Sequence, residues 1–141
     1  MATTWSLNEQ QVHFPPSVRQ RPRVLVVEDD PDCAACLALL LRLSGMAVEI
    51  AADGAAALES IQATQPDVVL MDIGLPDMDG YQVARRLGGL VAKKPLLIAL
   101  TGRVQEKGRQ SSANEDFDYH FVKPIDPAQL VALLNEYAAL L

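Results

Sequence analysis

The chain has 141 residues, half of them hydrophobic, which is enough for one domain with a full-sized core. Its 12 Lys and Arg residues against 18 Asp and Glu residues give a net charge of −6, which argues against generic binding to nucleic acid or to anionic membranes. With two cysteines, no signal-peptide pattern and no apolar run of about 18 residues, the sequence predicts a soluble protein in the reducing cytoplasm.

The first 22 residues differ in composition from the rest of the chain. They contain Pro15, Pro16 and Pro22, few aliphatic residues, and no hydrophobic period of either helix or strand. We therefore expect residues 1–22 to be a disordered or linker tail, and residues 23–141 to form a single domain.

Residues 24–27 form a continuous apolar run, typical of a strand buried on both faces of a parallel sheet. The run ends on Glu28, Asp29 and Asp30, and Pro31 follows. Asp30 and Pro31 suit the N-cap and first turn of a helix over residues 31–44. Glu28 and Asp29 have no such local use, and adjacent carboxylates repel one another unless a cation relieves them. The pair therefore predicts a divalent metal site.

The rest of the chain alternates between strand and helix patterns. Strands are expected at 48–51, 68–72, 96–100 and 119–122, and helices at 53–64, 80–88, 103–114 and from 127 to the end. The helix at 103–114 is polar and intrinsically weak. The last helix begins with Asp126 as N-cap and Gln129 at the third position, the pattern of a capping box. Five strands alternating with five helices predict an α/β fold, a parallel sheet covered on both faces.

Asp72 ends the strand at 68–72, where the chain turns abruptly. In open α/β sheets, ligands bind in the crevice beyond the carboxyl ends of the strands, so Asp72 is a candidate nucleophile or metal ligand. Polar residues follow other strands as well: Glu28 and Asp29, Thr101, and Lys123. Carboxylates, a hydroxyl and an ammonium group meeting at one sheet edge indicate a site that handles phosphoryl groups.

Four segments together resemble the receiver domain of two-component response regulators. They are residues 24–31, 70–80, 99–102 and 120–124, and the resemblance covers residues 23–141. It implies a flavodoxin-like, CheY-like fold with the strand order 2-1-3-4-5 and a switch point between the first and third strands, where Asp29 and Asp72 meet.

The resemblance also implies a role for each acid. Asp72 would be the phosphoacceptor, and Asp29 the main acidic ligand of Mg²⁺. Glu28, where Asp is commoner, would be a second acid that acts directly or through water, and the backbone carbonyl of Gly74 would complete the protein ligands. A few carboxylates and waters suit a hard octahedral cation.

Further roles follow for the residues near the last two strands. Lys123 would pair with the phosphoryl group, Thr101 would donate its hydroxyl to it, and Lys123–Pro124 would be a cis peptide. His120 occupies a switch position where Tyr or Phe is often found, so its coupling to Thr101 is expected to depend on pH. Arg103, with Gly74, would tune how readily water attacks the phosphoaspartate.

The resemblance implies a signalling domain, not an enzyme with a substrate of its own. The phosphoryl donor would be a histidine kinase or a histidine phosphotransfer protein, and the chain would be a stand-alone receiver or part of a larger regulator such as a hybrid kinase. The signal is expected to leave through the face made by the fourth helix, the fifth strand and the last helix. The last helix carries a wide apolar stripe for an effector or a second copy: Leu130, Val131, Leu133, Leu134, Tyr137, Leu140 and Leu141.

Three alternatives are disfavoured. A haloacid-dehalogenase-type phosphohydrolase needs a second acid two residues after its nucleophile, and that residue is Gly74 here. A pseudo-receiver that only binds partners does not explain why all the expected site residues are present. The spacing of Cys33 and Cys36 suggests redox chemistry, but with Leu37 and Leu40 they are expected to form a buried helix stripe.

Overall fold

The computed structural model describes residues 21–102 and 116–141. Its parallel sheet contains β1 (Arg23–Val27), β2 (Ala47–Ala51), β3 (Val68–Asp72), β4 (Leu96–Thr101) and β5 (Tyr119–Val122), in the order β2-β1-β3-β4-β5. The helices are α3 (Pro31–Leu43), α4 (Gly54–Thr64), α5 (Gly80–Leu87) and α7 (Pro127–Ala138). The predicted fold class and strand order are confirmed, while the helix expected at 103–114 lies outside the described residues. Within the described ranges, no helix is long and apolar enough to cross a membrane.

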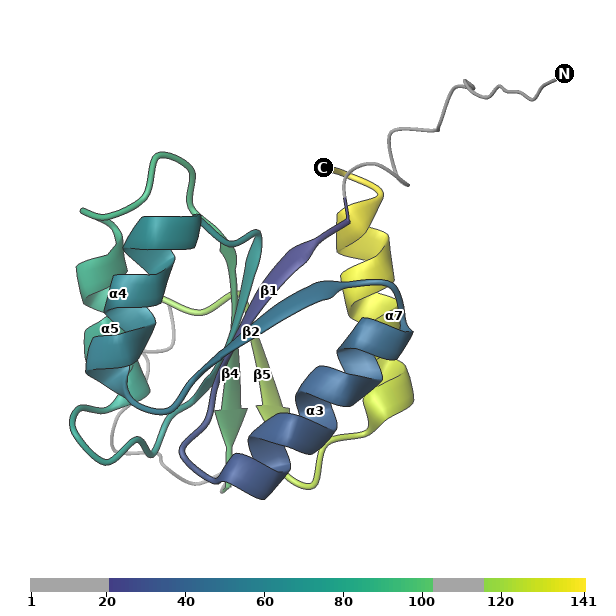
Figure 1. The fold of residues 1–141 in the computed structure, drawn as a ribbon, viewed down its shortest axis with the longest axis horizontal. Coiled ribbons are helices and arrows are strands. Elements are labelled where there is room, and N and C mark those ends of the chain that lie inside the picture. The colour runs from purple at the N-terminus through teal and green to yellow at the C-terminus, as the bar shows by residue number, and fades with distance from the viewer. Residues whose placement is uncertain (1–20, 103–115) are drawn as a thin grey trace, which may run out of the picture.

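Two hydrophobic cores lie on opposite faces of the sheet. Successive side chains of a strand point to opposite faces, so each apolar strand supplies both cores. Leu25, Val27, Val69 and Met71 pack under α4 and α5, whereas the alternate strand residues pack under α3 and α7. Figure 1 shows the two helix pairs on either side of the sheet. This double covering explains why the central strands read as unbroken apolar runs.

An aspartate caps the N-terminus of each described helix. Asp30 accepts hydrogen bonds from two backbone N–H groups of α3, and Asp53 and Asp126 cap α4 and α7. The reciprocal capping box occurs in α5, between Asp79 and Gln82. In α7, Asp126 instead accepts a hydrogen bond from the N–H of Ala128, so the box expected with Gln129 is wrong.

The apolar stripe of α7 serves mainly the core. Leu130 and Leu134 are fully buried, and Val131, Leu133 and Tyr137 pack against the same cluster. Leu140 follows the helix and is 81% exposed. The stripe is therefore narrower as a docking surface than the sequence suggested, because α7 closes the edge of the sheet and needs most of its apolar residues there.

The expected burial of Cys33 and Cys36 is wrong. The residues of α3 that face the sheet are Ala34, Ala38 and Leu41, spaced as one helical stripe, and both cysteines are exposed. Because Ala34 and Ala38 are small, α3 packs closely on the sheet along the stripe that contains them. The neighbouring positions Cys33 and Cys36 are therefore left exposed.

Candidate functional site

The register of the sheet brings the predicted polar residues to one level. Val27 pairs with Met71, so Glu28 and Asp72, the next residues along, lie beside each other on adjacent strands. Thr101 pairs with Val122, which places Lys123 one residue beyond. The carboxyl ends of β1, β3, β4 and β5 therefore bring the acids, the hydroxyl and the ammonium group together at one edge of the sheet.

Three carboxylates lie close together at this edge. One oxygen each from Glu28, Asp29 and Asp72 lie within 4.8 Å of one another. Glu28 is buried, Asp72 is partly buried and Asp29 is exposed. In the described part of the chain, no hydrogen bond or ion pair engages the Asp29 carboxylate, so it is available to a ligand. The clustered oxygens fit a hard divalent cation such as Mg²⁺.

Lys123 already neutralises part of this charge. Its Nζ lies 3.1 Å from Glu28 Oε1 and 3.5 Å from Asp72 Oδ2. Burial alone would lower the pKa of Lys123, but the hydrogen bond to Glu28 and the charges of Asp72 and Glu28 outweigh it and raise that pKa. Lys123 is therefore a cation at neutral pH. Glu28 Oε2 accepts the backbone N–H of Asp30 at 3.1 Å, so both oxygens of Glu28 have partners.

The turn after β3 orients Asp72. The backbone N–H of Gly74 donates to Asp72 Oδ1 at 3.1 Å, which leaves Oδ2 on the side of Lys123. Gly80 lets the turn pack closely against the start of α5, because a Cβ there would lie 3.2 Å from the backbone oxygen of Asp72, a tight contact. The turn thus holds one carboxylate oxygen in the protein and presents the other to the crevice.

A contact that sequence reasoning missed anchors the same turn to α4. Asp77 accepts the backbone N–H groups of Gly54 and Ala55, at 2.8 and 3.0 Å. These two bonds hold the pKa of Asp77 below its ordinary value. Met78 packs so closely against Gly54 that a Cβ at position 54 would collide with its side chain. A glycine directly after an N-cap aspartate was the available sequence signal.

Thr101 and the segment after β5 complete the arrangement. Thr101 is buried, and its carbonyl accepts the backbone N–H of Lys123 at 2.7 Å. The Lys123–Pro124 peptide bond is cis. His120 is exposed, and its ring packs against that of Phe117 in a T-shaped arrangement with centroids 5.7 Å apart. Partial burial lowers the pKa of His120, which favours the neutral imidazole at pH 7. Arg103 lies outside the described residues.

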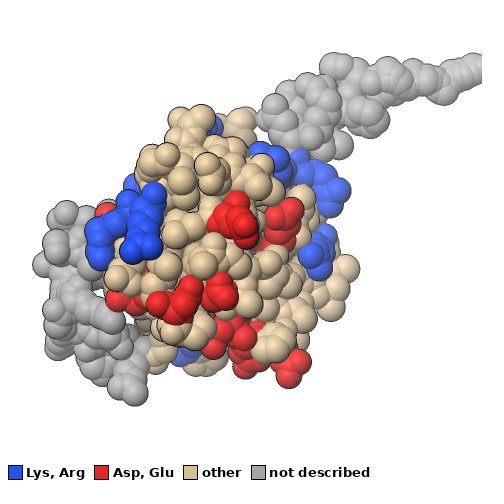
Figure 2. Space-filling model, turned by 60° about the vertical axis from the view of Figure 1, so that its left-hand side comes forward, with Lys and Arg blue, Asp and Glu red and all other residues tan. Residues whose placement is uncertain are grey.

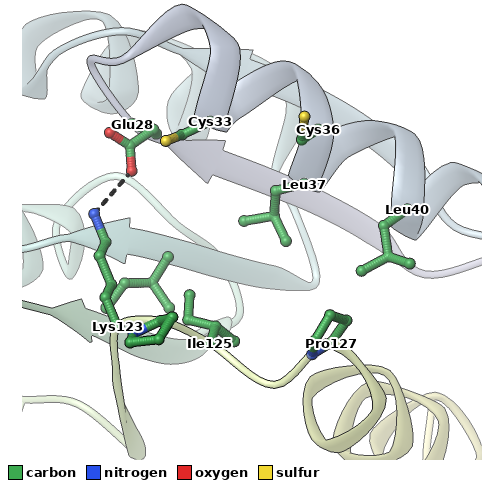
Figure 3. A pocket seen from close by; sticks show the side chains of 10 residues that line it. Glu28, Cys33, Cys36, Leu37, Leu40, Lys123, Ile125 and Pro127 are labelled. Atoms are coloured by element: carbon green, nitrogen blue, oxygen red, sulfur yellow. Dashed lines mark hydrogen bonds and ion pairs between the residues drawn. The ribbon is translucent and has the colours of Figure 1, made fainter.

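An apolar groove adjoins the site. It has a volume of about 580 Å³ and runs between α3 and the segment after β5. Figure 3 shows Glu28 and Lys123 at one end, joined by their ion pair, and Leu37, Leu40, Ile125 and Pro127 along the walls. The two cysteines lie on the same stretch of α3.

The charge on the surface is uneven. Figure 2 shows Asp and Glu side chains across the centre and lower part of one face, with Lys and Arg toward its sides. The arrows of β4 and β5 point downward in Figure 1, so the acidic lower part of this face lies at the carboxyl end of the sheet. Such an acidic rim attracts cations and repels polyanions that arrive without a cation.

Taken together, the site offers one oriented carboxylate, two further acids and one cationic ammonium group in a crevice. It lacks an acid two residues after Asp72, because that position is Gly74. The arrangement suits transfer of a phosphoryl group to Asp72, where catalysis consists of positioning and charge neutralisation. It does not provide the second acid that the phosphohydrolase alternative requires.

Comparison with known proteins agrees with this chemistry. The family model for the response regulator receiver domain matches residues 24–135. The transcriptional regulatory protein PrrA of Mycobacterium leprae is 40% identical over 111 residues, which cover 79% of this chain and 47% of PrrA. The chain therefore spans about half the length of that relative.

Solved structures share the fold. A CheY-like receiver domain from Methylobacillus flagellatus has a TM-score of 0.75 and 29% identity, covering 82% of this chain and 98% of that one. The response regulator TrrA from Thermotoga maritima, solved in complex with Mg²⁺-BeF, has a TM-score of 0.72 and 25% identity, covering 82% and 97%.

Proposed function

Because this chain belongs to the family of response regulator receiver domains, which act in two-component signalling, we propose that Asp72 is its phosphoacceptor. One observation carries the assignment. Asp72 is the strand-end acid that has a Mg²⁺-compatible carboxylate pair within 4.8 Å and a lysine ammonium 3.5 Å from its oxygen Oδ2. Glu28 has the same neighbours, but it is buried and each of its oxygens already accepts a hydrogen bond, from Lys123 and from the N–H of Asp30.

The transfer step needs no second protein nucleophile. An oxygen of the Asp72 carboxylate attacks the phosphorus of a phosphohistidine, forming an O–P bond while the P–N bond breaks. The departing imidazole nitrogen takes up a proton. Oδ2 is the attacking oxygen in this proposal, because Oδ1 is held by the N–H of Gly74.

Asp29, Asp72 and the carbonyl of Gly74 would hold Mg²⁺, and Glu28 would act through water. The basis for the last assignment is that both oxygens of Glu28 are already bonded, to Lys123 and to the N–H of Asp30. When bound, Mg²⁺ would neutralise phosphoryl oxygens and hold them toward Asp72.

Lys123 and Thr101 would receive the transferred group. Lys123 Nζ is paired with Glu28 at 3.1 Å but also lies only 3.5 Å from Asp72. A small displacement would therefore bring it to a phosphoryl oxygen on Asp72. The Thr101 hydroxyl would donate to another oxygen, and His120 would then take up the space behind it. Gly74 and Arg103 would set how fast water removes the group.

The partners follow from the same family. The donor would be a histidine kinase or a histidine phosphotransfer protein, and residues 23–141 would act as the receiver. The tail expected over residues 1–22 lies outside the described residues, apart from Arg21 and Pro22. The output would leave through the face made by the helix expected at 103–114, which lies outside the described residues, together with β5 and α7. Tyr119 and Val122 of β5 are exposed, as is Leu140 just after α7. An effector or a second copy of the chain would bind there.

Incubation with acetyl phosphate and Mg²⁺ tests the phosphoacceptor. Intact-mass spectrometry is expected to show one phosphoryl adduct on the wild-type chain and none on Asp72→Asn. Addition of EDTA should suppress the adduct, because the carboxylate cluster then repels the incoming phosphoryl group. An adduct that persists in Asp72→Asn, or that forms equally in EDTA, would refute the assignment.

A further inference from the structure

The chain's two cysteines, Cys33 and Cys36, lie one helical turn apart on α3. Both thiols are exposed, and both line the apolar groove next to Glu28 and Lys123. Figure 3 shows the Cys33 side chain directed toward Glu28, with Cys36 one turn further along the helix. Phosphoryl transfer to Asp72 uses neither thiol.

We propose that Cys33 and Cys36 are a redox-active dithiol, which closes to a disulfide within α3 by exchange with a low-molecular-weight disulfide such as oxidised glutathione. Disulfides in reducing compartments are mostly transient and serve catalysis or redox sensing. The exposure of both thiols, together with their spacing, is what distinguishes this pair from two buried core cysteines.

Helix geometry permits the bond but strains it. Residues three apart in an α-helix have Cα atoms about 5 Å apart, within the range that disulfides span. Their Cβ atoms are about 5–6 Å apart, whereas a disulfide needs about 3.8 Å. The helical turn from Cys33 to Cys36 must therefore tighten to bring the sulfurs together. A strained disulfide of this kind is readily reduced, as a reversible signal requires.

The two thiols differ in their surroundings. Cys33 Sγ donates a hydrogen bond to Asp30 Oδ2 at 3.4 Å. That bond, followed by burial and the charge of Asp30, raises the pKa of Cys33 and keeps it a thiol. Cys36 is thus the first to attack.

The exchange balances with one oxidant. The Cys36 thiolate attacks a sulfur of oxidised glutathione, which forms a mixed disulfide and releases one glutathione thiolate. Cys33 then loses its proton and displaces the second glutathione. Two protein thiols are oxidised in total, and one glutathione disulfide is reduced to two thiols.

Closure of the disulfide disturbs the acidic site. Cys33 must turn away from Asp30, and Asp30 both caps α3 and donates its backbone N–H to Glu28. Tightening of the turn from Cys33 to Cys36 therefore shifts the N-terminal end of α3, which lies next to the carboxylate cluster. This step rests on the proposed function, and it predicts Mg²⁺ binding several-fold weaker in the oxidised chain.

Mass spectrometry after acid quench tests the dithiol itself. The wild-type chain in excess oxidised glutathione should lose two hydrogen atoms and retain no glutathione. Cys33→Ser and Cys36→Ser are matched controls, and each should hold one stable glutathione adduct. Asp30→Asn keeps an N-cap residue but weakens the bond to Cys33, so it should close the disulfide faster. Wild-type protein that accumulates mixed disulfides or covalent dimers, or that keeps both thiols, would overturn the proposal.

Calorimetric Mg²⁺ titration separates the redox effect from the proposed function. Reduced wild type and glutathione-treated Cys33→Ser should bind Mg²⁺ equally, and oxidised wild type more weakly. Unchanged binding after oxidation would refute the coupling and leave the metal site intact. Absence of binding in the reduced chain would instead count against the proposed function.

Discussion

At the scale of single residues, the pairing of Lys123 with Glu28 explains how the acidic crevice is stable before any ligand arrives. Glu28 is 6% exposed, so its charge needs a partner inside the protein. Lys123 supplies it while its own side chain remains about a third exposed, at 34%. Glu28 therefore keeps the Lys123 ammonium group close to Asp72, from where it can move to a phosphoryl oxygen.

The substitution Lys123→Met removes the ammonium group but keeps an apolar stem of similar length. We expect it to lower the free energy of unfolding by about 1–2 kcal/mol, because the buried carboxylate of Glu28 loses its counter-charge, with solvent moderating the loss. Urea unfolding at neutral pH measures the change.

The control is the same substitution made in a Glu28→Gln background. There the buried charge is absent, so Lys123→Met should destabilise the fold much less, giving a coupling energy above about 0.5 kcal/mol. Equal losses in both backgrounds would contradict the ion pair.

At the scale of elements, the turn that follows Asp72 is tied to the neighbouring helix α4. Asp77 caps the first backbone N–H groups of α4, in addition to Asp53, the N-cap of that helix. Two acids therefore share the positive end of α4, where the helix dipole favours negative charge. Displacement of the turn must loosen the start of α4.

This link predicts a pH dependence. The pKa of Asp77 is lowered in the folded state, so its contribution to stability is present above the ordinary value of 3.8 and is lost as pH falls through the lower folded value. Asp77→Asn should therefore be less stable than wild type at neutral pH, and the gap should narrow between about pH 4 and pH 2. Thermal melts across that range measure it.

Asp32→Asn is a suitable comparison, because Asp32 is an exposed acid in the first turn of another helix, α3. At neutral pH, Asp32→Asn should lose less stability relative to wild type than Asp77→Asn does. A constant gap between Asp77→Asn and wild type at every pH would refute the charged contact.

The architecture was predictable because each strand and each helix start has a local signal. Apolar runs such as 68–72 indicated the strands, and Asp30, Asp53 and Asp126 marked helix starts through side-chain bonds to nearby backbone groups. The gathering of Asp72, Thr101 and Lys123 followed from the common direction of parallel strands.

Two features could not be predicted from the sequence. The first is the rotation of α3 about its own axis. The periodicity of α3 fits two neighbouring stripes, and the buried one was decided by the close approach of Ala34 and Ala38 to the sheet. The partner of Lys123 likewise depends on side-chain reach, since Glu28 is one residue from Asp29 and both follow the same strand.

At the scale of the whole molecule, Mg²⁺ should stabilise the fold. The native state holds the three carboxylates together, whereas the unfolded chain has no such cluster, so binding favours folding. At a Mg²⁺ concentration ten times the dissociation constant, the expected gain is about 1.4 kcal/mol. Thermal or urea unfolding with and without Mg²⁺ measures it.

Asp29→Ala is the informative variant for this effect. It should lose most of the Mg²⁺ response and be more stable than wild type without Mg²⁺, because one repelling carboxylate is gone. Asp32→Ala, which removes a nearby acid outside the cluster, should keep the response. An unchanged response in Asp29→Ala would exclude the proposed metal site.

The identity of the phosphorylated residue is the central claim, and borohydride reduction tests it most directly. Borohydride reduces an acyl phosphate to an alcohol, so a phosphorylated aspartate becomes homoserine, which peptide sequencing by mass spectrometry locates. After treatment with acetyl phosphate and Mg²⁺, homoserine is expected at position 72 and should be absent from the EDTA sample. Homoserine at Asp29 or Asp77, or at no position despite a phosphoryl adduct on the intact chain, would contradict the assignment of Asp72.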